Sequence, residues 1–97
     1  MTRKEALELE NKCDKLMAEY IKEGCCVSLS LTGKLKIEFD DNYITLNRKR
    51  REVDYINYIG YYDDLIEIVN QAFNCIEDYE DDFNKLIWSY EHITELE

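Results

Sequence analysis

The chain has 97 residues, of which 45% are hydrophobic and 12% aromatic, and it carries a formal net charge of -10. This length suits a single domain, 1–97, and the apolar content is too high for a disordered chain. The charge argues against direct binding of nucleic acid, and no apolar run is long enough for a membrane span or signal peptide, so we expect a cytoplasmic protein of the host cell.

The first predicted element is a helix. Thr2 and Glu5 form a capping-box pattern, in which a hydroxyl and a carboxylate each satisfy a free backbone amide of the first turn. Apolar residues then recur at alternating spacings of three and four, as on one face of a helix. Gly24 offers a left-handed stop, so we expect a helix of about six turns.

From Cys25 the apolar period changes to two, which is typical of half-buried strands. Thr32-Gly33 and the acidic turn Asp40, Asp41 and Asn42 separate three such segments, ending at Asn47. The pattern predicts a three-stranded antiparallel meander. Its inward side chains are expected to be Val27, Leu29, Leu31, Leu35, Ile37, Phe39, Ile44 and Leu46.

A basic run, Arg48 to Arg51, follows the third strand. With Tyr43, Tyr55 and Tyr58 in its vicinity it has the residue types that bind nucleic acid, but the net charge opposes that function. We therefore interpret it as a loop whose arginines pair with carboxylates of the protein or of a partner. The segment 52–62 stays open between a fourth strand, a helical turn and an irregular stretch.

The C-terminal third is predicted to be helical. Its apolar stripe consists of Leu65, Val69, Ala72, Ile76, Tyr79, Phe83, Leu86, Tyr90 and Ile93. Repulsion among the carboxylates of 77–82 makes a break plausible there, so one long helix and two shorter ones are alternatives. The helical stripes would cover the apolar face of the sheet in an α+β domain, αβββα or αβββαα.

Trp88 falls opposite the apolar stripe when the last helix is projected as a continuous one, together with Asp63, Glu67, Asn70, Asn74, Glu77, Asp81 and Glu95. An exposed tryptophan is a candidate anchor for a partner. The alternative is that a break near Asp78 rotates Trp88 into the core.

Residue types that form catalytic or metal-binding sites in other proteins are rare in this sequence. The only histidine, His92, lies among carboxylates, and no nucleophile motif, phosphate loop, zinc-ligand pair or calcium loop is present. Cys25 and Cys26 are adjacent, and Cys13 and Cys75 occupy apolar helical positions, so reduced thiols are expected. We expect a binding protein without catalysis, cofactor or metal.

The negative charge is concentrated in the C-terminal third. Acidic and basic residues balance over 1–59, whereas Lys85 is the only cation in 60–97. Such a field attracts basic clefts. The alternative is that the acidity only keeps the protein in solution.

Two acidic segments, Asp40-Asp41-Asn42 and the run Glu77, Asp78, Tyr79, Glu80, Asp81 and Asp82, resemble those of the short acidic anti-CRISPR proteins that inhibit type II effector nucleases. The order of predicted elements is also similar. The resemblance implies an inhibitor that mimics DNA and occupies the nuclease's site for the protospacer-adjacent motif. It implies the residues of both segments as contacts and a guide-loaded nuclease as partner. Trp88 is a further candidate anchor from the helical projection alone.

Another phage-encoded inhibitor that mimics DNA toward a different defence protein is an alternative. A further alternative belongs to another class, a homodimeric helical adaptor. Its seam would consist of Val69, Ile76, Phe83, Leu86 and Tyr90, because the same heptads would serve a coiled coil.

Overall fold

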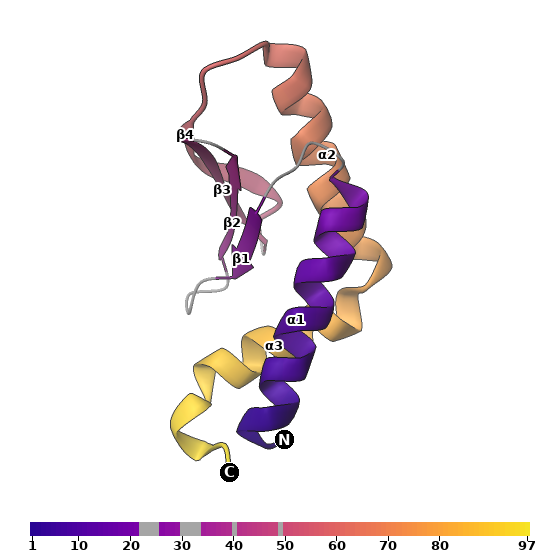
Figure 1. Ribbon diagram of the computed structural model, residues 1–97, viewed down its shortest axis with the longest axis vertical. Coiled ribbons are helices and arrows are strands. Elements are labelled where there is room, and N and C mark those ends of the chain that lie inside the picture. Colours follow the sequence, from indigo (N-terminus) through magenta and orange to yellow (C-terminus); the bar gives the residue numbers. More distant parts are fainter. Residues whose placement is uncertain (22–25, 30–33, 40, 49) are drawn as a thin grey trace.

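The computed structural model describes residues 1–21, 26–29, 34–39, 41–48 and 50–97, with the side chains of 26–29, Phe39 and Tyr62 outside the description. An N-terminal helix is followed by a meander and then by two helices and a short 3-10 turn (Figure 1). The elements are α1 (Arg3–Tyr20), β1 (Cys26–Leu29), β2 (Lys34–Phe39), β3 (Asn42–Asn47), β4 (Glu52–Asn57), α2 (Tyr62–Asp78), α3 (Glu80–Glu91) and η1 (Ile93–Glu95).

The predicted α+β class and the order helix, antiparallel sheet, two helices are confirmed. The sheet contains the three predicted strands, and the segment that the sequence left open adds a fourth at the edge, in the order β1-β2-β3-β4. β4 pairs with β3 through a bulge, because Thr45 lies opposite Tyr55 while Leu46 lies opposite Val53. The bulge interrupts the period of two that would have identified this strand.

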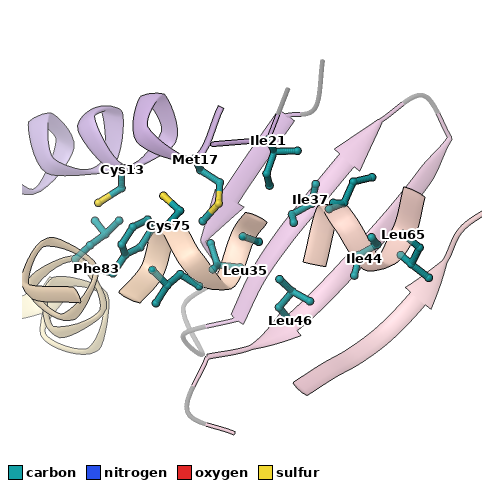
Figure 2. Packing of buried hydrophobic residues seen from close by; sticks show 14 residues of the cluster. Cys13, Met17, Ile21, Leu35, Ile37, Ile44, Leu46, Leu65, Cys75 and Phe83 are labelled. Carbon is teal, nitrogen blue, oxygen red and sulfur yellow. The ribbon is translucent and has the colours of Figure 1, made fainter. Parts of the chain in front are cut away.

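The core lies between the sheet and the helices. Leu35, Ile37, Ile44 and Leu46 are fully buried, which confirms their inward orientation. Figure 2 shows them facing α2. Met17 of α1 and Ile21, the residue that follows α1, lie above them in this view. The orientations predicted for Val27, Leu29, Leu31 and Phe39 lie outside the described residues. The domain is elongated, 44 by 23 by 22 Å, because α3 extends beyond the sheet (Figure 1).

Helix α1 begins as predicted, since the Thr2 hydroxyl accepts a hydrogen bond of 3.1 Å from the Glu5 amide. It ends at Tyr20, before the predicted stop at Gly24, and Ile21 is already extended. Cys13, Met17 and Ile21 are buried, whereas Leu7 is exposed. The buried stripe is therefore narrower than the apolar pattern of the sequence.

Thr2→Ala is expected to lower the free energy of unfolding by about 1 kcal/mol, because it removes the only side-chain acceptor for the Glu5 amide at this cap. Urea denaturation would measure the change. Thr94→Ala, at an exposed position where no side-chain hydrogen bond caps the 3-10 turn, is the control and should have no comparable effect. An equal loss in both variants would contradict a capping role for Thr2.

The C-terminal helical region breaks at Tyr79, whose φ of -121° and ψ of 38° interrupt the helix. The prediction that Tyr79 belongs to the core stripe is wrong, because the break turns its side chain toward solvent, where it is 36% exposed. Ile93 is likewise exposed. Phe83 and Leu86 are buried as predicted.

The predicted homodimer seam is also wrong as an intermolecular surface. Ile76, Phe83 and Leu86 are buried in the protein's own core, where α1 packs against both α2 and α3. In Figure 2, Cys13 of α1 and Cys75 of α2 lie beside Phe83. A coiled coil through these residues would require the domain to open.

Candidate partner-binding site

The corner between α2 and α3 gathers the acidic run that the sequence singled out. Glu77 and Asp78 belong to the last turn of α2, and the carboxylates of residues 80–82 belong to the first turn of α3. Residues 77–82, here called the acidic corner, line a shallow depression of about 340 Å³. All of them are exposed except Asp82, which is half-buried. The break at Tyr79 thus presents the run as one continuous acidic surface.

Helix stability accounts for only part of this cluster. Glu80, Asp81 and Asp82 lie at the positive end of α3, where carboxylates are favourable by about 0.3–1 kcal/mol each. Glu77 and Asp78 lie at the negative end of α2, whose last turn contains no basic residue. Their position opposes the helix dipole, so helix formation does not explain them.

Three carboxylates of the corner have partners within the protein. Asp78 accepts a hydrogen bond from the Tyr20 hydroxyl, which raises the pKa of Tyr20 to about 12. Lys12 lies 3.1 Å from Asp82, and Arg51 lies 3.2 Å from Glu77. Within the described part of the chain, the carboxylates of Glu80 and Asp81 form no ion pair. These two carry the charge that a partner would meet first.

The basic loop packs against the acidic corner. The Arg48 guanidinium donates hydrogen bonds of 2.7 Å to the Asn84 side chain and 3.4 Å to the Glu80 carbonyl oxygen, and its burial lowers its pKa. Arg51 adopts a left-handed backbone, with φ of 53°, and its side chain reaches Glu77.

Arg50 is paired as well, since it lies 2.9 Å from Asp54. The interpretation that the loop's arginines pair with carboxylates is therefore confirmed for Arg50 and Arg51, whereas the hydrogen bonds of Arg48 go to an amide side chain and a backbone carbonyl oxygen. Lys49 lies outside the described residues.

Trp88 lies beside the corner. It is 46% exposed, and its ring stacks on His92 with centroids 4.3 Å apart. The break does not rotate it into the core, because Phe83, Leu86 and Ile87 occupy the buried face of α3. The positions predicted to lie opposite the apolar stripe with Trp88 are all exposed.

A depression of about 500 Å³ connects Trp88 with the acidic corner. Glu77 and Glu80 belong to both depressions, so tryptophan and carboxylates form one continuous surface. Sequence reasoning missed Asn84 and Glu91, although their spacings of four and three from Trp88 place them on its helical face. The lining consists of Arg48, Arg51, Ile76, Glu77, Glu80, Asn84, Ile87, Trp88 and Glu91.

The second predicted acidic segment lies elsewhere. Asp41 and Asn42 are at the turn between β2 and β3, whereas the loop that contacts the corner follows β3. A strand the length of β3 spans about 20 Å, so the two groups lie at opposite ends of the sheet. Asn42 accepts a hydrogen bond of 3.0 Å from the Ile59 amide, which fixes the connection to α2. Asp40 lies outside the described residues.

The described residues contain no cluster of three metal-ligating side chains. The thiols of Cys13 and Cys75 are buried, and burial raises the pKa of each to about 12, which suppresses the reactive thiolate. The His92 ring lies against Trp88, with Nδ1 2.8 Å from the Trp88 carbonyl oxygen. The two thiols lie in the core, whereas the carboxylates of the corner and the ring of Trp88 are exposed at the surface.

Comparisons with protein-family models, curated proteins and solved structures found no match to this chain. Over the described residues, no helix combines the length and the apolar character needed to cross a bilayer.

Proposed function

We propose that this protein is a phage-type inhibitor that binds the basic groove of a nucleic-acid-binding defence protein through its acidic corner and Trp88. The observation that carries the proposal is the pair of carboxylates, Glu80 and Asp81, that form no ion pair with any described residue and adjoin a half-exposed tryptophan across two connected depressions. A charged surface alone would only keep the protein in solution. An aromatic ring within it supplies the apolar area that a specific contact requires.

Mimicry of DNA follows from the chemistry of such grooves. Proteins that bind DNA place arginine and lysine side chains where phosphates or base edges will lie, and a carboxylate can replace these acceptors in a bidentate pair with arginine. Among the described residues Glu80 and Asp81 form no ion pair, whereas Lys12, Arg51 and Arg50 are held by Asp82, Glu77 and Asp54. Binding at the groove would compete directly with target DNA.

As the specific partner we propose a type II CRISPR effector nuclease loaded with its guide RNA. Such nucleases read their short duplex motif with arginines in a basic groove, so the corner has the complementary charge. Support for this partner comes from the acidic run itself, placed between two C-terminal helices after an antiparallel sheet. The acidic turn at Asp41 would contact the partner separately, at the far end of the sheet.

The double variant Glu80→Lys with Asp81→Lys is expected to weaken binding to the guide-loaded nuclease by about 100-fold or more, because two favourable charge pairs become repulsive. The measurement is competition with labelled target DNA at low and moderate salt, and inhibition by the wild-type protein should weaken as salt rises.

The matched control is Asp63→Lys with Asp64→Lys. This pair also lies in the first turn of a helix, is exposed, and changes the net charge by the same amount. Its inhibition should stay within a few-fold of wild type. Equal losses in both double variants would mean that overall acidity, and not the corner, causes binding. Absence of inhibition in the wild-type protein would refute the nuclease as partner.

A further inference from the structure

The edge strand β4 exposes apolar side chains next to an unpaired backbone edge. Val53, Tyr55 and Ile56 are 39%, 55% and 44% exposed, and among the described strands only β3 pairs with β4. Exposed edges of this kind bind further strands unless charge, proline or distortion prevents it. The sequence contains no proline, so the bulge is the feature that decides which strand fits here.

The pairing with β3 determines the face on which each β4 side chain lies. Val53 is opposite Leu46 and Ile56 is opposite Ile44, so both lie on the core face. Glu52, Tyr55 and Asn57 are opposite Asn47, Thr45 and Tyr43 on the outer face. Asp54, the extra residue of the bulge, pairs with Lys34 and Arg50, and Lys34 belongs to the outer face of β2.

The resulting pattern of faces reads the same in both directions along the strand: outer, core, outer, outer, core, outer. The two strands of an antiparallel pair run in opposite directions. A second copy of β4 therefore places its core-face residues opposite the core-face residues of the first, and its outer-face residues opposite the outer-face residues. A regular strand alternates without the doubled outer position, and its side chains would fall out of phase across the bulge. The edge therefore fits another copy of itself better than a regular strand.

We propose that the protein self-associates through antiparallel pairing of β4 with β4 of a second copy, Val53 lying opposite Ile56 and Asp54 opposite Tyr55. Two four-stranded sheets would then become one continuous sheet across a two-fold axis. This interface is distinct from the helical seam, whose residues are in the core, and it does not depend on the proposed function.

Local charge favours this pairing despite the net charge of the chain. Glu52 would lie opposite Asn57, so no like charges are directly opposed. Asp54 would approach its own copy diagonally, but Lys34 and Arg50 already neutralise it and hold its pKa below the ordinary value. The acidic corner belongs to the junction of α2 and α3, not to this edge.

Residues that follow β4 expose further apolar side chains. Ile59 and Tyr61 are 85% and 82% exposed in the connection from β4 to α2, which stands away from the sheet in Figure 1. A stable interface buries about 800 Å² on each partner, more than one short strand provides. These two side chains supply part of the difference, and we expect an association in the micromolar range or weaker.

The test is sedimentation equilibrium of the full chain from micromolar to millimolar concentration. The wild-type mass should rise from 11.7 kDa toward twice that value. Ile56→Lys should weaken association by at least about tenfold, which corresponds to 1.4 kcal/mol. Leu7→Lys, which removes an exposed aliphatic side chain on α1, is the matched control and should associate as the wild type does.

Amide hydrogen exchange identifies the surface used. Amides of residues 52–57 should exchange more slowly as concentration rises in the wild type and in Leu7→Lys, but not in Ile56→Lys. A wild-type protein that stays monomeric at millimolar concentration would overturn the proposal. So would association that leaves exchange in β4 unchanged, or association that Ile56→Lys does not weaken.

Discussion

Phe83→Ala is expected to lower the free energy of unfolding by about 3–5 kcal/mol, the usual range for truncating a fully buried aromatic residue. Phe83 is 0% exposed and lies with Cys13 and Cys75 where α1 crosses the two C-terminal helices. Small domains have total stabilities of about 5–15 kcal/mol, so the loss is a large part of the whole. Urea denaturation followed by circular dichroism would measure it.

Trp88→Ala is the matched control, since it removes a larger ring from the same helix at a position that is 46% exposed. It should cost less than about 1 kcal/mol of stability while weakening partner binding. If the seam were intermolecular, Phe83→Ala would instead change the oligomeric state and leave the monomer folded. That result, or a larger loss of stability in Trp88→Ala, would contradict the packing described for α3.

Raising the pH from 7 to 10 is expected to lower the free energy of unfolding by about 3 kcal/mol through two thiols. Burial is the main reason that the pKa values of Cys13 and Cys75 are raised from the usual 9.0 to about 12 in the folded protein. Between these values a thiol ionises in the unfolded chain but not in the folded one. Stability is therefore complete below pH 9 and falls as the pH rises above it, by about 1.4 kcal/mol per unit for each thiol.

Urea unfolding at pH 7, 9 and 10 under reducing conditions measures this dependence. The step from pH 9 to 10 covers one unit of the slope of about 1.4 kcal/mol per pH unit for each thiol. In Cys75→Ala the loss between pH 9 and 10 should fall to about half, because one of the two thiols is gone. An unchanged slope would mean that another group, such as a tyrosine, causes the alkaline loss. At pH 7 both native thiols should resist a thiol reagent until the protein unfolds.

The sequence alone determined the elements whose signal is local. The cap at Thr2, the alternation through Leu35 and Ile37, and the spacing of Phe83 and Leu86 are each readable within a few residues. They suffice to predict the α+β order of helix, sheet and C-terminal helical region, because burial of one face imposes its period on each element. The acidic run at 77–82 was identified in the same way, but the sequence left open whether the helix breaks there and whether Trp88 is exposed.

Only the tertiary structure decided how distant segments meet. β4 was not recognised, because the bulge at Asp54 breaks the period of two. Tyr79 left the predicted stripe because the helix breaks at that residue, and the seam of the proposed coiled coil became the contact of α1 with α2 and α3.

The candidate site depended most on these long-range contacts. Which carboxylates remain available follows from where the chain brings three distant residues. Lys12 and Arg51 form ion pairs with Asp82 and Glu77, and Tyr20 donates a hydrogen bond to Asp78. The same chain path places Asp41 at the opposite end of the sheet from the corner. The sequence shows how many acidic residues are present, but residues far away in the chain decide which carboxylates form an ion pair or a hydrogen bond.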